Sequence, residues 1–139
     1  MSVGQPTMYL AFGDTTDAKD RSAAAKAVTN DYVAGPAFSI VEGQIIQLLA
    51  VCLLANSSTE LSFMLEVSHG GDQWFPLCAA DAMAVSGGEI QSDIYPLVYK
   101  LPAADARLRA FSFLAQANRA RLLVKGDVAG ATVLVKAMV

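Results

Sequence analysis

The chain has 139 residues, 54% of them apolar and 17% charged, with a mean hydropathy of +0.40. This length fits one domain that buries a core without metals or disulfides, and a net charge of −3 argues against a nucleic-acid partner. A small interior cannot hide so many apolar side chains. We therefore expect partner molecules to cover part of the apolar surface.

Residues 1–32 differ in composition from the rest. Charged residues cluster there before an alanine-rich stretch, and Thr15 or Thr16 is a candidate cap for a short helix through residues 23–27. Alanines offer little area for docking, so one expectation is an N-terminal arm that orders on a neighbouring subunit. A flexible terminus or a short first strand is the alternative. Residues 33–139 are expected to form the folded domain, and no signal peptide is expected.

The apolar run at residues 44–55 follows a strand expected at 37–41, after the turn signal Gly35-Pro36. It is apolar at both alternating sets of positions, which is typical of a strand buried on both faces or of a buried helix. Turn-like flanks favour a central strand. If one face of this strand is uncovered within the subunit, that face is a candidate contact surface. The run is far shorter than the ~20 residues that cross a bilayer, so we expect no membrane partner.

A β-hairpin is predicted at residues 61–77. Apolar and mixed positions alternate from 61 to 68, which sends alternate side chains to opposite faces of a strand. Gly70 and Gly71 then provide the backbone freedom of a tight turn. Trp74 opens the return strand, and Pro76 indicates that this strand is short or lies at an edge.

The remaining chain also favours strands. A long excursion at residues 79–96 is typical of a functional loop or of disorder, and a short strand is expected at 97–101. Residues 103–118 have helix-forming composition but an alternating pattern, which favours a strand. Strands at 119–125 and 131–139 are joined by five residues, which predicts antiparallel neighbours. The fold expected is an all-β antiparallel sandwich or jelly roll of about seven to eight strands, with the extended N-terminal arm.

Few residues suggest chemistry. His69 is the single histidine, which excludes metal sites built on a histidine pair and leaves little for a catalytic dyad. Cys52 and Cys78 lack further ligands at zinc spacing, and we expect them to act as small apolar residues rather than as a disulfide. No glycine-rich nucleotide loop is present. We therefore expect no enzyme activity, no cofactor and no metal.

Two groups of side chains are candidates for binding. Trp74 beside a glycine-rich turn is suited to stacking on a sugar, with Phe75 and Asp72 near it, although anchoring the hairpin is the plainer role. Four arginines, if their strands are adjacent, form one basic face for an acidic partner, although arginines on an exposed sheet are also ordinary solubilising residues. These arginines are Arg107, Arg109, Arg119 and Arg121.

The segment 65–77 resembles the hairpin "E-x-S-x-D-G-x-x-W" of many tailed-phage virion structural proteins, including capsid decoration (cement) and tail-associated β-sandwiches. Here Gly70-Gly71-Asp72 replaces the Asp-Gly of that pattern. The two C-terminal strands look like the closing strands of the same proteins. Extracellular and carbohydrate-binding sandwiches carry similar turns.

The resemblance implies a non-enzymatic virion structural protein, with a capsid decoration protein as the leading interpretation. The alternatives are a tail or head-tail accessory protein and a carbohydrate- or receptor-binding module. The expected location is the virion, after assembly in the host cytoplasm. The expected partners are further copies of the chain, for example in a trimer, and a major capsid or tail protein. We expect the contacts to involve Trp74, Phe75, Tyr95, Tyr99, Arg107 and Arg109.

Overall fold

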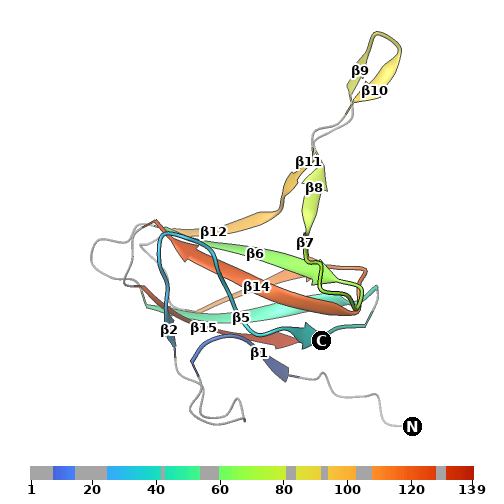
Figure 1. Cartoon of the computed structure of the whole chain (residues 1–139). Coiled ribbons are helices and arrows are strands. Elements are labelled where there is room, and N and C mark those ends of the chain that lie inside the picture. Colours follow the sequence, from blue (N-terminus) through green and yellow to red (C-terminus); the bar gives the residue numbers. More distant parts are fainter. Residues whose placement is uncertain are drawn as a thin grey trace.

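Two β-sheets pack face to face in the computed structural model, and a narrow two-stranded ribbon stands away from them (Figure 1). The structure describes residues 8–14, 25–41, 43–53, 60–80, 84–91, 94–102, 108–127 and 131–139. Within these ranges every strand pair is antiparallel and there is no helix, hence none that could cross a membrane. The all-β antiparallel sandwich expected from the sequence is confirmed.

The first sheet, called here the β5 sheet, has the strand order β1-β15-β5-β13, and β2 also pairs with β15. Its central strand β5 covers most of the 44–55 run, which confirms the central strand expected there. The strands of this sheet are β1 (Met8–Phe12), β2 (Lys26–Ala27), β5 (Ile45–Leu53), β13 (Leu108–Leu114) and β15 (Thr132–Met138).

The second sheet, called here the β6 sheet, has the order β12-β6-β14-β3, with β4 on β14 and β7 on β6. Strands β6 and β7 form the hairpin predicted at residues 61–77, and Gly70 in its turn has a φ of 92°. The strands are β3 (Val33–Ala34), β4 (Phe38–Ser39), β6 (Glu60–Ser68), β7 (Phe75–Pro76), β12 (Val98–Pro102) and β14 (Arg119–Gly126).

The hydrophobic core lies between the two sheets. Strands of both sheets alternate buried and more exposed residues, so one apolar side of each strand faces the other sheet. Removing this area from water is the main term that stabilises the body, at about 25 cal/mol per Å². The largest fully buried side chains are Phe12, Phe63, Phe113, Ile46, Leu48, Leu61, Leu65, Leu122, Val28, Val124, Val133 and Val135.

The described part of residues 1–32 belongs to the β5 sheet. Strand β1 pairs along β15, with Met8 opposite Met138, as in the short-first-strand alternative. Strand β2 occupies Lys26–Ala27, inside the stretch considered for a helix; the rest of that stretch up to residue 24 lies outside the described residues. β1 also approaches the β6 sheet closely, because a Cβ on Gly35 would stand 1.8 Å from the carbonyl oxygen of Ala11.

The prediction that the last two long strands are neighbours is wrong. β14 lies between β6 and β3, whereas β15 lies between β1 and β5 in the other sheet. A connection of five residues is long enough to cross the ~10 Å that separates packed sheets. The crossing places each strand between two partners, so neither β14 nor β15 is left at an edge.

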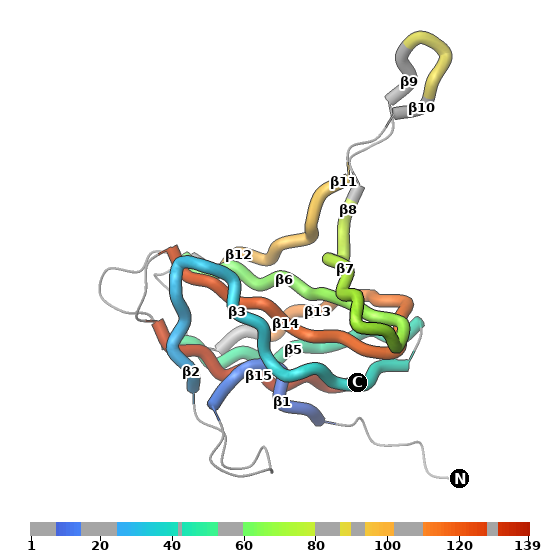
Figure 2. The backbone as a smooth tube through the Cα atoms, viewed as in Figure 1, coloured from blue at the N-terminus to red at the C-terminus, as the bar shows by residue number. Residues whose placement is uncertain are grey.

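The ribbon lies within residues 78–96, and its described strands are β8 (Cys78–Ala80), β9 (Ala84–Ser86), β10 (Glu89–Gln91) and β11 (Ile94–Pro96). β8 pairs with β11, and β9 with β10. The ribbon interrupts the edge strand next to β6: β7 ends opposite Glu66, and β12 resumes opposite Met64. Figure 2 follows the backbone out of this edge and back into it.

Candidate contact surfaces

The outward side of the β5 sheet is apolar. Along β5 the residues between the buried ones point away from the core, and Ile45 and Val51 are 62% and 47% exposed. Their cross-strand partners Leu114 and Leu134 are apolar too. We call this surface the outer face; its exposed or half-buried apolar side chains are Met8, Leu10, Ile45, Leu49, Val51, Leu114, Leu134 and Met138.

Charge is nearly absent from the outer face. Among the described residues of β1, β5, β13 and β15, Lys136 is the only charged one at an outward position. An antiparallel sheet with one side in water normally alternates apolar and polar side chains. The composition of this face is instead typical of a surface that another molecule covers.

A shallow hollow of about 350 Å³ marks one end of the outer face. It is lined by Ile45, Gln47, Ser112, Met138 and Val139. Three of these five side chains are apolar and none is charged. The hollow has room for one or two large apolar side chains. Its apolar, uncharged lining is typical of the centre of a protein contact.

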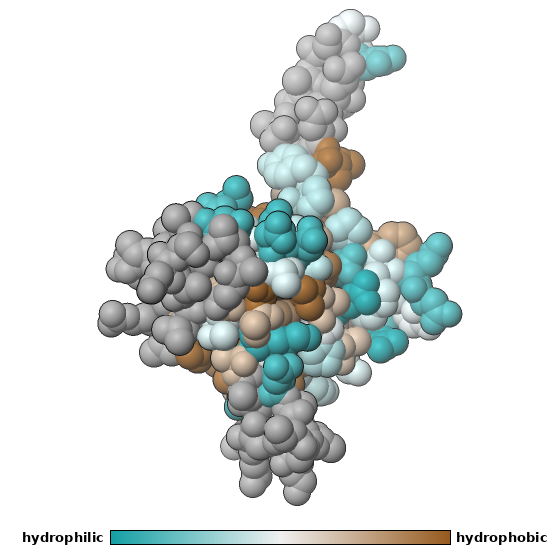
Figure 3. All heavy atoms as spheres, turned by 60° about the vertical axis from the view of Figure 1, so that its left-hand side comes forward, coloured by the Kyte–Doolittle hydropathy of each residue, from teal (hydrophilic) through white to brown (hydrophobic). Residues whose placement is uncertain are grey.

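Apolar side chains are also exposed at the ribbon and its foot. Phe75 is 52% exposed, Ile94 74% and Tyr95 43%, and Figure 3 shows hydrophobic atoms where the ribbon leaves the body. Phe75 and Tyr95 were both expected as contact residues. The structure places them at the foot of the same projection, on β7 and β11.

Trp74, the residue singled out in the hairpin, is partly covered by arginines. The guanidinium of Arg121 lies 4.5 Å from the ring centroid, and that of Arg119 lies 5.6 Å away. Arg121 also donates from Nε to Glu66 Oε1 over 2.7 Å, across the β14-β6 pair. The indole therefore packs against cations from the neighbouring strand β14, a contact that supports the hairpin-anchoring role for Trp74.

Tyr99 lies at the edge strand β12 and packs into an aromatic cluster. Its ring centroid is 5.3 Å from that of Phe111 and 4.9 Å from that of Phe113, and its hydroxyl donates to the carbonyl oxygen of Ser112 over 2.8 Å. With 37% of its surface exposed, it joins β12 of one sheet to β13 of the other. Its position indicates a structural role with a small exposed rim.

The three arginines that the structure describes do not lie in one sheet. Arg119 and Arg121 are on β14 in the β6 sheet, whereas Arg109 is on β13 in the β5 sheet, where its backbone lies opposite Ala50. Arg107 lies outside the described residues. The condition set for one basic face, that their strands are adjacent, is not met, because β13 pairs with β5 in one sheet and β14 lies in the other.

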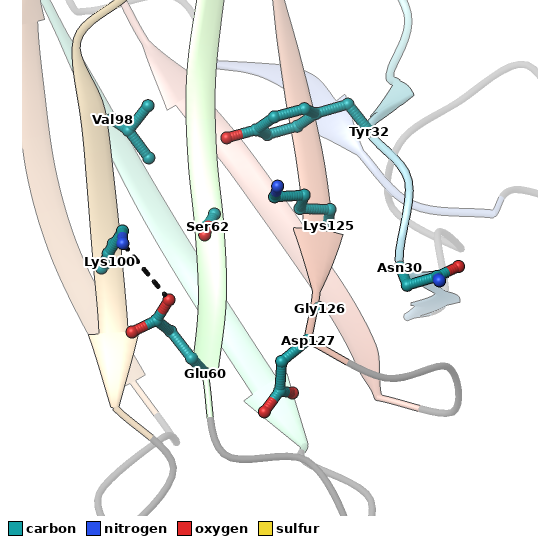
Figure 4. Close-up of a pocket in the computed structure, with 9 residues that line it drawn as sticks. All are labelled: Asn30, Tyr32, Glu60, Ser62, Val98, Lys100, Lys125, Gly126 and Asp127. Carbon is teal, nitrogen blue, oxygen red and sulfur yellow. Dashed lines mark ion pairs between the residues drawn. The ribbon is translucent and has the colours of Figure 1, made fainter.

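A polar pocket of about 490 Å³ lies on the outward side of the β6 sheet (Figure 4). The Lys125 ammonium is 4.7 Å from the centroid of Tyr32, and Lys100 pairs with Glu60 over 3.6 Å. Burial raises the pKa of Tyr32 above its ordinary value of 10.0, although a hydrogen bond with Ser62 partly offsets this. The pocket is lined by cationic side chains that donate hydrogen bonds and by carboxylates that accept them. It therefore suits a neutral polar group or a zwitterionic group.

The remaining candidates for chemistry are the single histidine and the two cysteines. His69 is exposed in the hairpin turn, and no three His, Cys, Asp or Glu side chains there are grouped to hold a metal ion. Cys52 is buried, Cys78 is exposed on the ribbon, and no disulfide joins them. No protein family, curated protein or solved structure was found to match the chain.

Sequence reasoning missed most of the outer face. Leu10, Leu114 and Met138 were not among the expected contact residues. A signal was present, because β5 and β15 carry apolar residues at both alternating sets of positions. Such a pattern shows that both sides of a sheet avoid water, but it does not tell which side packs within the subunit.

Proposed function

We propose that this chain is a non-enzymatic virion structural protein, and that it acts as a capsid decoration protein. The observation that carries the proposal is the outer face of the β5 sheet. A sandwich of this size exposes an apolar sheet surface with one outward charge, Lys136, among its described residues. A protein that worked alone in water would be selected for a more polar surface there.

Two further features support the same function. The hairpin that resembles those of tailed-phage structural proteins is an antiparallel pair with Trp74 anchored beside it. The ribbon adds an element that extends well beyond the body and exposes Phe75, Ile94 and Tyr95. A decoration protein needs both a stable body and surfaces that bind its neighbours on a particle.

The mechanism is burial of apolar surface between many copies. Each contact contributes about 25 cal/mol of binding free energy per Å² of apolar surface that it buries, less the cost of association. One contact alone is therefore weak or moderate. On a particle the copies are held together, and their contributions act through multivalency. Stabilisation of the particle therefore needs neither catalysis nor a cofactor.

Light scattering of the purified protein over a concentration series tests the assembly part of this proposal. We expect the mean mass to rise with concentration to a small closed oligomer such as a trimer. Val51→Asp places a charge on the outer face and should lower the mass, whereas Ala34→Asp adds the same charge at an exposed position of β3 in the other sheet and should not. Equal masses for wild type and Val51→Asp would contradict a role for this face.

Mass spectrometry of virions purified from the source of the chain tests the virion part. Peptides of this chain should be present at a copy number comparable with that of the major capsid protein. Their absence from intact virions would contradict the proposal. A copy number of a few per virion would instead favour the tail or head-tail alternative.

A second candidate is binding of a glycan or another polar receptor group, and the polar pocket favours it. Tyr32, Lys125 and Ser62 bring an aromatic ring, a cation and a hydroxyl to one hollow. Titration with neutral and acidic glycans, followed by the NMR shifts of residues lining the pocket, would show saturable changes if this function operates. The same titration of Tyr32→Ala should then show none.

A further inference from the structure

We propose that the ribbon of one copy docks into the hollow on the outer face of a second copy, so that the subunits bind head to tail. The proposal deepens the assembly function above and rests on it. The ribbon and the hollow are then each other's partners. The ribbon of one copy occupies the hollow of the next, which is lined by Ile45, Met138 and Val139.

The ribbon is built as a separable part of the fold. Leu77 donates its backbone N–H to Leu65 over 2.8 Å in the β6 sheet, and its carbonyl oxygen accepts from Leu97 over 2.9 Å at the foot of the ribbon. The next pair along β6 is Met64 with Val98. Leu77 and Val98 thus occupy consecutive positions opposite β6, and residues 78–97 are inserted between them without a shift in register.

An insertion of this kind is not needed by the body. The register of the edge strand continues on both sides of it, and Ile94 at its foot is 74% exposed. A long exposed ribbon with apolar side chains loses conformational entropy on folding and recovers little by packing. Its apolar residues gain stabilisation when a second molecule covers them.

The ribbon cannot cover the outer face of its own subunit. It leaves from the edge of the β6 sheet and runs away from the body (Figures 1 and 2). The hollow is lined instead by outward residues of the β5 sheet, among them Ile45, Gln47 and Met138. The contact must therefore be made between copies. Each copy then offers one ribbon and one hollow, and such a heterologous contact closes into a ring when the rotation between subunits allows it.

The two surfaces are complementary in chemistry. The hollow takes one or two large apolar side chains, and Ile94 on β11 is 74% exposed, whereas Tyr95 next to it points to the opposite face of the ribbon. Residues 78–96 include three acidic residues and no basic one. In the described residues the ribbon carries Glu89 and the outer face has Lys136 as its one outward charge, so the two surfaces carry unlike charges.

Three variants and one control test the proposal. Deletion of residues 78–97 joins Leu77 to Val98 and removes the ribbon, and Ile94→Asp changes the ribbon without shortening it. Ile45→Asp places an acidic group in the hollow, where it meets the acidic ribbon. Ala34→Asp carries the same added charge on β3 and is the matched control. Circular dichroism and thermal unfolding of each variant establish that the body is folded.

Light scattering should show the wild type and Ala34→Asp as oligomers, and the three test variants as monomers. Head-to-tail binding also predicts which pairs of variants form a complex when they are mixed. The deletion variant retains a hollow and Ile45→Asp retains a ribbon, so an equimolar mixture should form a complex of two chains that grows no further. Ile94→Asp mixed with the deletion variant has no intact ribbon and should stay monomeric.

The possible failures are distinct. If the deletion variant and Ile94→Asp still assemble while Ile45→Asp does not, the outer faces pair with each other; head-to-tail docking is then overturned and the assembly function stands. If the wild type is monomeric at every concentration, both are overturned for the protein in solution. A mixture of the deletion variant with Ile45→Asp that contains only monomers also overturns the docking.

Discussion

Leu97 donates its backbone N–H to the carbonyl oxygen of Leu77 over 2.9 Å, and this bond closes the foot of the ribbon. On its other side Leu77 is bound to Leu65, so one residue belongs to both the body and the ribbon. Because hydrogen-bonded and non-hydrogen-bonded pairs alternate along an antiparallel ladder, Pro76 falls at a position where no N–H is needed. The edge strand therefore accepts a proline and an insertion next to each other.

The body should remain stable without the ribbon. A variant lacking residues 78–97 keeps the β6 pairings of Phe75 and Val98, and it loses mainly the half-buried contact of Leu97 with the core. We expect the free energy of unfolding to fall by no more than about 1–2 kcal/mol, as for loss of a partly buried apolar side chain. Urea unfolding followed by circular dichroism measures this free energy. A variant whose body fails to fold would contradict the view that the ribbon is an insertion that the body does not need.

Neighbouring leucines on β5 should respond very differently to truncation. Leu48 is fully buried between the sheets, whereas Leu49 is half-buried on the outer face. Leu48→Ala should cost about 2–5 kcal/mol because it leaves a cavity, and Leu49→Ala well under half of that. Chemical denaturation of both variants at low protein concentration makes the comparison. Similar losses would mean that the outer face is not open to solvent.

The sequence predicted the fold class because alternation along single strands is a local property. The hairpin at 61–77, the central strand at 45–53 and the edge position of Pro76 all follow from patterns within a few residues. Pairing between strands is not local. The connection after Gly126 has the length of a hairpin loop and also the length of a crossing between sheets, and only packing of β14 on β6 and β15 on β5 decides between them.

The contact surface was harder to predict for a related reason. Exposed Ile45 and buried Ile46 are the same residue type at adjacent positions, and nothing in the residues themselves tells which faces the core. The sequence left open whether Trp74 stacks on a ligand or anchors the hairpin, because the glycine-rich turn before it shows no partner for the ring. The arginine that stacks on it comes from β14, more than forty residues later in the chain.

Gly35 should tolerate no side chain. A Cβ at this position would stand 1.8 Å from Ala11 O, at the point where β1 meets the β6 sheet. Because the three nearest atoms, from Ala11 and Phe12, all belong to the backbone, Gly35→Ala must move a strand. We expect a loss of about 1–3 kcal/mol, as for overpacking. Gly71→Ala is the control, since its Cβ would approach nothing closer than 3.9 Å. Thermal unfolding of the pair should separate them clearly.

Stability should fall at alkaline pH through Tyr32. Burial raises its pKa above the ordinary 10.0, so the folded state holds a proton that the unfolded state has already lost. Stability is then unaffected below pH ~10 and decreases as the pH rises towards the folded-state pKa. Tyr32→Phe should lack this decrease. Ser62→Ala removes the hydrogen bond that lowers the pKa, so it should extend the decrease to higher pH in a pH series of denaturation curves.

Arg121 should matter far more than Arg119, although both lie over Trp74. Arg121 makes two contacts of 2.7 Å with Glu66 Oε1, and the two side chains are only 30% and 15% exposed. Arg121→Met leaves this carboxylate with neither its counter-charge nor its hydrogen bond, which should cost roughly 1–3 kcal/mol. Arg119 is exposed and has no carboxylate within 4.0 Å among the described residues, so Arg119→Met should change stability by less than about 0.5 kcal/mol.

Fluorescence of Trp74, the single tryptophan, reports the same difference. Loss of Arg121 removes the group that covers one face of the indole at 4.5 Å, so its emission should shift to longer wavelength as water replaces the guanidinium. Glu66→Gln should produce part of this shift, because Arg121 then loses the carboxylate that holds it over the ring. A double-mutant cycle of positions 66 and 121 should show coupling. Additive effects would mean that Trp74 and Arg121 are held in place independently of Glu66.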